Sequence, residues 1–229
     1  MIYSAHQPQY LPWLGFFDKI NKSDCFVFLD SVQYKHREFQ NRNKIRTKDG
    51  WIWLTVPVSS QRGVKVCDVK IDNSRGWRNQ HLKSLNAWYA KSEFFKEYFL
   101  FFKELYEKEW DKLIDLNVAV TKYLLEVFGI KTKIYYESDL AAGGEKTDRI
   151  VNIGRKLGAD VYLSGAGGRD YLQEVEFAKA GFKLEYQEFK HPVYKQQYCG
   201  SEKDFIPFMS AIDMLFNEGG TRCIKNIGV

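Results

Sequence analysis

The chain has 229 residues, of which 45% are hydrophobic and 28% are charged, and its net charge is +5. This composition excludes wholesale disorder and predicts a large buried core. The mild positive charge favours an anionic ligand such as a phosphate-bearing small molecule, whereas the scattered lysines and arginines argue against a nucleic-acid-binding protein.

The first 30 residues alternate between strand and helix patterns. Residues 2–6 predict a strand and residues 13–21 predict a helix, and the continuous apolar run at 25–30 predicts a buried parallel strand. Together these segments form a βαβ unit. We expect further strands at 51–58 and 65–71.

The middle of the chain has a helical pattern. Apolar residues recur at three- and four-residue spacing within 78–90, 94–110 and 111–129. We therefore expect a helical lobe over about 77–129.

The alternating pattern then resumes. Strands are predicted at 131–138, 159–165 and 182–189, a helix at 146–158 with Gly158 as its C-cap, and a closing helix at 205–220 with a double-glycine stop. Alternating strands and helices predict a single α/β domain over 1–229, built as a Rossmann-like parallel sheet with an inserted or appended helical lobe.

Two further classes of protein are disfavoured by local patterns. The four cysteines form no CxxC pair and have no metal-like spacing to a histidine, so we expect reduced thiols and no metal site. No apolar run approaches the roughly 18–20 residues that span a bilayer, and no basic segment followed by an apolar stretch opens the chain. We expect a cytoplasmic protein with no membrane contact.

Three polar loops follow predicted strands, and in a parallel sheet they would meet at the carboxyl edge, where ligands bind. The first loop, HQPQYLP, begins with His6, which could act as a base or polarise a carbonyl. The alternative is a tight turn capped by the imidazole. Gln7, Gln9 and Tyr10 add hydrogen-bonding groups, and the two prolines stiffen the loop.

The second loop begins with Asp30, a candidate binding residue, and carries the basic segment QYKHREFQNRNKIRT. Basic residues with aromatic rings between them could hold a phosphate or pyrophosphate. The favoured contacts are Arg37, Asn41, Arg42 and Lys44. For Lys35, Arg46 and Lys48 we expect a solvated loop.

The third loop, LSGAGGRDYL, follows a buried strand, and its glycines allow close approach of a ligand to the backbone. Its candidate binding residues are Ser164, Gly165, Gly167, Gly168, Arg169 and Asp170.

Two later stretches are open to two interpretations. Lys146, Thr147 and Asp148 could point into the cleft, or Thr147 could cap a helix. His191 and Tyr194 could supply a second catalytic histidine and a substrate wall, or could belong to a turn built on Pro192.

These segments together resemble the WbqC-like family of bacterial proteins. The resembling stretches are HQPQYLPWLGFFDKI, FVFLD with VQY, FQNRNKIRT, WLTVPV, KTDRI, GADVYLSGAGGRDYL, HPVY and SAIDMLFNEG. The resemblance implies a role in the biosynthesis of O-antigen (lipopolysaccharide) or other surface polysaccharides. It also implies an acyl or aminoacyl transferase, for example a glycyl transferase, acting on a nucleotide-linked amino sugar.

A more distant likeness links the strand, PxxxG loop and helix to Rossmann-like nucleotidylyltransferases, including pantothenate synthetase-like amide ligases. Phe16 stands where those enzymes carry a second histidine after the glycine. This likeness implies ATP with magnesium as the cofactor, whereas the first resemblance implies an acyl or aminoacyl carrier, such as a carrier protein. A nucleotide- or sugar-binding module without catalysis is the third hypothesis, because the same cleft would serve it.

Overall fold

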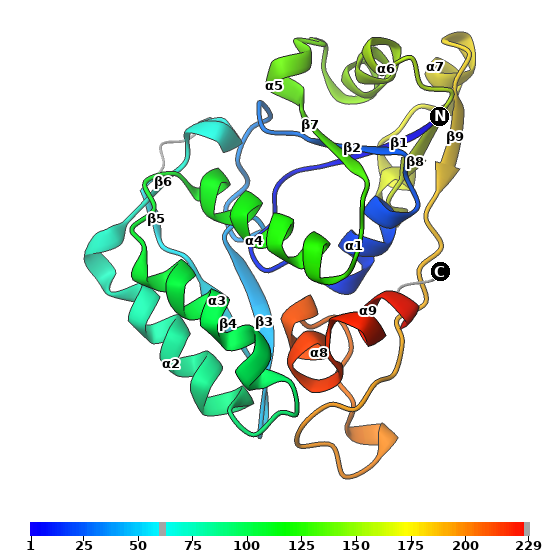
Figure 1. Ribbon diagram of the computed structural model, residues 1–229. Coiled ribbons are helices and arrows are strands. Elements are labelled where there is room, and N and C mark those ends of the chain that lie inside the picture. Colours follow the sequence, from blue (N-terminus) through cyan, green and yellow to red (C-terminus); the bar gives the residue numbers. More distant parts are fainter. Residues whose placement is uncertain (60–62, 227–229) are drawn as a thin grey trace.

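The computed structural model describes residues 1–59 and 63–226. Five short strands pair in parallel to form the central sheet (Figure 1): β1 (Ile2–His6), β2 (Cys25–Phe28), β7 (Lys133–Tyr136), β8 (Val161–Ser164) and β9 (Lys183–Tyr186). Their order in the sheet is β7-β2-β1-β8-β9. From β1 the chain adds β2 and then β7 on one side of the sheet, and afterwards adds β8 and then β9 on the other side of β1. This reversal between β1 and β8 is the switch point at which doubly wound folds bind ligands, and the predicted α/β Rossmann-like sheet is confirmed.

The sheet is covered on both faces, which explains why its inner strands read as continuous apolar runs. On β2, Cys25 and Val27 face one layer, and Phe26 and Phe28 face the other. The first layer contains α5 (Glu137–Leu140), α6 (Lys146–Leu157) and α7 (Glu174–Lys179) (Figure 1). The second contains α1 (Leu14–Asn21) and α4 (Leu113–Val127), and Phe28 packs there on Tyr136.

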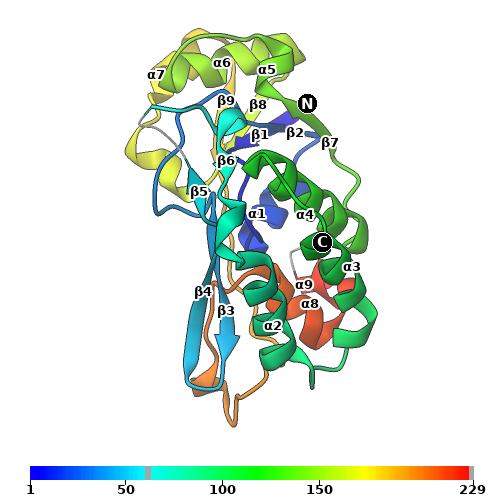
Figure 2. The same cartoon turned by 90° about the vertical axis from the view of Figure 1, so that its left-hand side faces the viewer.

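A large insertion separates β2 from β7. It contains the antiparallel hairpin β3 (Arg42–Thr47) and β4 (Gly50–Thr55), the short pair β5 (Val58–Ser59) and β6 (Lys70–Ile71), and the helices α2 (Trp77–Tyr89), α3 (Phe95–Glu107) and α4. Figure 2 shows the hairpin extending away from the central sheet alongside α2. The C-terminal helices α8 (Ala211–Glu218) and α9 (Gly220–Asn226) complete this half, and α8 contacts both α3 and β3. The remaining turns are 3₁₀ helices at Val66–Asp68, Asn73–Arg75, Ala166–Asp170 and Glu202–Asp204.

Three sequence expectations need correction. The basic segment ending in RNKIRT is strand β3, because Asn43 and Ile45 are buried on one face while Arg42 and Lys44 are partly exposed on the other. Arg46 is buried and donates to the Gly50 carbonyl oxygen at 2.9 Å. The strand expected at 65–71 is a 3₁₀ turn followed by the two-residue β6. The closing helix begins only at Ala211, capped by the Ser210 hydroxyl, and after Gly219 the chain continues as α9 instead of stopping. No helix in the part of the chain that the structure describes combines the length and hydrophobicity that crossing a bilayer requires.

Candidate functional site

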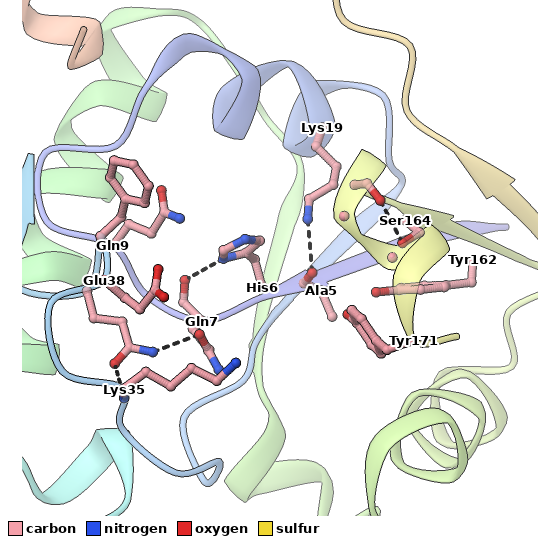
Figure 3. A pocket seen from close by; sticks show the side chains of 15 residues that line it. Ala5, His6, Gln7, Gln9, Lys19, Lys35, Glu38, Tyr162, Ser164 and Tyr171 are labelled. Atoms are coloured by element: carbon pink, nitrogen blue, oxygen red, sulfur yellow. Dashed lines mark hydrogen bonds between the residues drawn. The ribbon is translucent and has the colours of Figure 1, made fainter. Parts of the chain in front are cut away.

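A cavity of about 400 Å³ opens at the switch point, where β1 and β8 end side by side. Figure 3 shows its walls. The first loop, the segment after β2, helix α1 and the loop after β8 all contribute, through Ala5, His6, Gln7, Gln9, Lys19, Lys35, Glu38, Phe39, Gln40, Tyr162, Ser164, Gly165, Gly167, Gly168 and Tyr171. The structure thus brings the first and third predicted loops together with part of the second.

His6 ends β1 and forms part of the cavity wall. Its Nδ1 lies 2.9 Å from the Gln7 carbonyl oxygen, which can only accept, so Nδ1 carries the proton. Nε2 is therefore left as a hydrogen-bond acceptor. Burial and the nearby Lys19 charge lower the pKa of His6 to about 3. At neutral pH the imidazole is thus uncharged and suited to orienting a donor rather than to taking up a proton.

The orientation of the Gln7 amide is set by a chain of hydrogen bonds. The Lys35 backbone N–H donates to Gln40 Oε1 at 3.1 Å, and Gln40 Nε2 donates to Gln7 Oε1 at 2.7 Å (Figure 3). Gln7 Nε2 is therefore the donor that remains for a ligand. Gln9 is 7% exposed, and its Oε1 has no hydrogen-bond partner among the described residues. This oxygen is itself buried, so Gln9 contributes to the cavity wall through the rest of its side chain.

Lys19 is a site residue that the sequence reasoning missed. It lies on α1 with 3% of its surface exposed, and its Nζ donates to the Ala5 carbonyl oxygen at 3.0 Å. The neighbouring Asp18 accepts instead from Lys22 and Gln187. Burial lowers the pKa of Lys19 to about 7, so a large neutral fraction exists at neutral pH. The available signal was its spacing: Lys19 is one helical turn after Gly15, on the face that opens to the cavity.

The loop after β8 forms the opposite wall through backbone and small side chains. Ser164 is buried and donates to the Gly165 carbonyl oxygen at 3.0 Å. A Cβ at Gly168 would lie 2.0 Å from Ser164 Oγ, so only glycine fits there. Arg169 turns away to stack on Tyr186 at 4.0 Å, and Asp170 is exposed on the 3₁₀ turn. These two residues are not part of the cavity wall.

Buried amides hold the first loop rigidly against the insertion. Asn43 Nδ2 donates to the Leu11 carbonyl oxygen at 2.6 Å, and Asn117 Nδ2 donates to the Gln40 carbonyl oxygen at 2.8 Å. The Tyr10 backbone N–H donates to the Phe39 carbonyl oxygen at 3.0 Å. The first loop and residues 35–40 therefore form one preorganised wall, which explains the dense polar and proline-rich opening of the sequence.

Two predicted contacts near the cavity have structural roles instead. Tyr10 is fully buried, and its hydroxyl is bonded to His81 and Tyr106 at 2.8 and 2.5 Å. Asp30 accepts twice from Ser138, through its backbone N–H at 3.0 Å and its hydroxyl at 2.6 Å, and it lines a different cavity beside α4.

The predicted phosphate contacts also lie elsewhere. Arg42 and Lys44 point outward from β3 and stack on Trp53 and Trp51, each at 4.3 Å. The exposed Arg37 has a left-handed backbone, and its carbonyl oxygen accepts from the Arg42 guanidinium. Asn41 Nδ2 donates to the Val56 carbonyl oxygen at 2.9 Å. Within the basic segment, the basic residue that lines the cavity is Lys35, which was expected to be solvated.

Neither of the two stretches with alternative interpretations lines the first cavity. Thr147 lies inside α6 and accepts from the Gln173 backbone N–H at 3.2 Å, so it is not the cap. Lys146 opens α6 with a left-handed backbone, and Asp148 lines a separate cavity beside α7.

Both ring nitrogens of His191 are occupied. Nδ1 donates to the Pro192 carbonyl oxygen at 2.8 Å, and Nε2 accepts from the Phe208 backbone N–H at 3.1 Å. Tyr194 donates to the buried Asp213 at 2.6 Å. His191 and Tyr194 therefore stabilise the C-terminal loop, and His191 has no nitrogen free for proton transfer.

A second cavity of about 530 Å³ adjoins the first and shares His6, Lys19, Gly165 and Gly167 with it. Its other walls come from the start of α1 and from two C-terminal loops, through Trp13, Gly15, Phe16, Ala166, Gln187, Glu188, Phe189 and Phe208. A Cβ at Gly15 would lie 2.2 Å from the Trp13 ring, so glycine is needed for this ring to fold over the helix start.

Comparison with known proteins agrees with the sequence resemblance. The model of the WbqC-like protein family matches residues 7–224. The chain is also similar to the uncharacterized protein Rv1507c of Mycobacterium tuberculosis (strain ATCC 25618 / H37Rv), with 31% identity over 217 residues, 93% of this chain and 92% of that protein. No solved structure matches the chain. The chain belongs to the WbqC-like protein family.

Proposed function

We propose that this chain forms an amide on a nucleotide-linked amino sugar, by transferring an acyl or aminoacyl group to the sugar amine during synthesis of a bacterial surface polysaccharide such as O-antigen. One observation carries the proposal. A neutral histidine with a free acceptor nitrogen and a buried lysine without a carboxylate partner among the described residues line the same cavity. An acceptor and a weakly basic amine are the groups that an attacking amine requires.

In this reaction the sugar arrives as an ammonium ion and must lose a proton before it attacks. Neutral Lys19 takes that proton, and His6 Nε2 accepts a remaining N–H and orients the lone pair. The amine nitrogen then bonds to the acyl carbon, while the bond from that carbon to a thioester sulfur or an acyl-phosphate oxygen breaks. Lys19 returns its proton to the leaving group, takes up the second proton that the nitrogen loses as the amide forms, and releases it to solvent. Gln7 Nε2 is a donor available to the carbonyl oxygen as negative charge develops there.

The remaining polar lining suits a sugar. Gln9 and Glu38 lie on the same wall, and Ser164 faces them across the cavity. Figure 3 shows the Glu38 carboxylate turned into the cavity on the side of His6 opposite Lys19. Lys35 supplies positive charge for a nucleotide phosphate.

An ATP-dependent ligase is the second candidate, and the strand order favours it. The first loop lies at the switch point, where doubly wound sheets bind nucleotides. In that case the acyl donor would be an adenylate formed in the same crevice.

The test compares thermal shifts with a UDP-amino sugar and with the same UDP-sugar carrying a hydroxyl in place of the amine. Ligands that bind only the native state raise the melting temperature by mass action. We expect the amino sugar to give the larger shift, and the Lys19→Met variant to lose that difference. Equal shifts for the two sugars would contradict the proposal.

A mass-spectrometric assay then follows acylation of the amino sugar with acyl-CoA, or with a free acid plus ATP and magnesium. A mass gain that requires ATP supports the ligase. A larger shift with the amino sugar but no mass gain from either donor supports a binding module without catalysis.

A further inference from the structure

The second cavity is walled by aromatic side chains from distant parts of the chain. Trp13 precedes α1, whereas Phe189 follows β9 and Phe208 precedes α8. The Trp13 ring contacts Phe189 edge-on at 5.3 Å and Phe208 at 5.7 Å between ring centroids. Phe16 adds a fourth ring beside His6. Three segments thus converge to build a chamber with an aromatic wall, and Gln187 and Glu188 are polar residues of the same lining.

Phe208 is held at this chamber in an unfavourable conformation. Its side chain is 55% exposed and its backbone φ is +60°, a region that phenylalanine rarely adopts. His191 accepts from its backbone N–H, and the His191 ring packs against both Phe208 and Phe189. Strained residues that the surrounding structure holds in place cluster at ligand sites. An exposed ring kept there by a half-buried histidine indicates a ligand surface.

The two cavities meet at the groups that the proposed reaction uses. His6, Lys19 and Gly165 line both. A polar molecule in the first cavity and an apolar group in the second would therefore approach each other at the Lys19 amine.

We infer, on the basis of the proposed function, that the aromatic cavity is the donor subsite and that it accepts an uncharged apolar acyl group. Four rings favour an apolar or planar group. Glu188 also lines this cavity, but the ammonium of an aminoacyl donor is one carbon away from its carbonyl. That carbonyl must lie at Lys19, which becomes positively charged when it takes the proton. The volume of about 530 Å³ lies within the range of small-molecule sites. The inference selects acyl over aminoacyl transfer.

The test uses unreactive amides that mimic the donor group. Benzamide and butyramide are neutral, whereas glycinamide carries an ammonium on the same carboxamide. Saturation-transfer NMR measures their binding to the full chain and to two variants. Phe208→Ala removes a ring from the donor subsite. Phe39→Ala is the matched control, because Phe39 is also exposed, at 39%, but lines the first cavity.

We expect benzamide and butyramide to bind more tightly than glycinamide. Phe208→Ala should weaken benzamide about three- to tenfold, the equivalent of one lost aromatic contact, while Phe39→Ala leaves it unchanged. This result supports the donor subsite even if the amino sugar gives no selective thermal shift, which would refute only the proposed function. Tighter binding of glycinamide, equal weakening in both variants, or no binding of any amide overturns the inference and leaves the amino-sugar test unaffected.

Discussion

Replacing Lys19 with methionine should stabilise the protein while abolishing its activity. Burial lowers the lysine pKa from 10.5 to about 7, which corresponds to about 5 kcal/mol of unfavourable free energy for the charged form in the native state. Methionine has a similar length and no charge, but it loses the hydrogen bond to the Ala5 carbonyl oxygen, worth about 1 kcal/mol. We expect the free energy of unfolding of Lys19→Met to exceed that of the parent by about 2–4 kcal/mol at pH 7.

The stability difference between Lys19→Met and the parent should also depend on pH. Between pH 7 and 10.5 the unfolded chain keeps the lysine proton and the native protein loses it, so the parent becomes more stable as the pH rises. The advantage of Lys19→Met should therefore shrink by about 2 kcal/mol between pH 7 and pH 9, as measured by urea unfolding. Lys83→Met, the same exchange at an exposed lysine of α2, should change stability by less than about 0.5 kcal/mol at either pH. A methionine variant that is less stable than the parent at pH 7, by an amount independent of pH, would refute the reasoning.

Three other substitutions test the site and its support. His6→Ala should abolish turnover with little change in melting temperature, because His6 acts through a nitrogen that the fold does not use; a large drop in melting temperature would make it structural. Arg42→Ala should leave the Michaelis constant for a phosphorylated substrate unchanged, because its guanidinium stacks on Trp53 away from the cavity; a raised constant would return it to the site. Asn117→Ala should lower the free energy of unfolding by about 1–3 kcal/mol, because it leaves the Gln40 carbonyl oxygen unsatisfied; an unchanged urea midpoint would contradict that role.

The sequence predicts the parts of this protein that depend on local pattern. The buried strands can be predicted because a parallel strand covered on both faces must be apolar. The loops that follow them can be predicted because the chain must turn there, and Gly and Pro mark those turns. The same pattern predicts His6, Gly165, Gly167 and Gly168 as site residues, and all four line the cavity.

The parts that were not predicted depend on distant partners. Asn43 reads as a loop residue, yet it faces inward on β3 because Leu11 supplies an acceptor 32 positions away. Lys19 reads as a solvated helical lysine until α1 is known to be buried along nearly its whole length. His191 resembles a catalytic group until Phe208 is seen to occupy its second nitrogen. A sequence pattern gives only residue types and their spacing. The roles of Asn43, Lys19 and His191 depend on tertiary contacts that the pattern does not contain.

The position of β1 at the centre of the sheet has a consequence for folding. Tyr3 pairs with Cys25 on one side and with Tyr162 on the other, so one edge of β1 is completed by a neighbour and the other by a distant segment. Pairing β1 with β8 closes the long stretch of chain between Tyr3 and Tyr162. This closure has an entropic cost and makes the parallel pairing slow. The crevice between β1 and β8 exists only after that closure. Ligand recognition is therefore acquired late in folding, and a molecule bound in the crevice would slow unfolding of the whole sheet rather than of one loop.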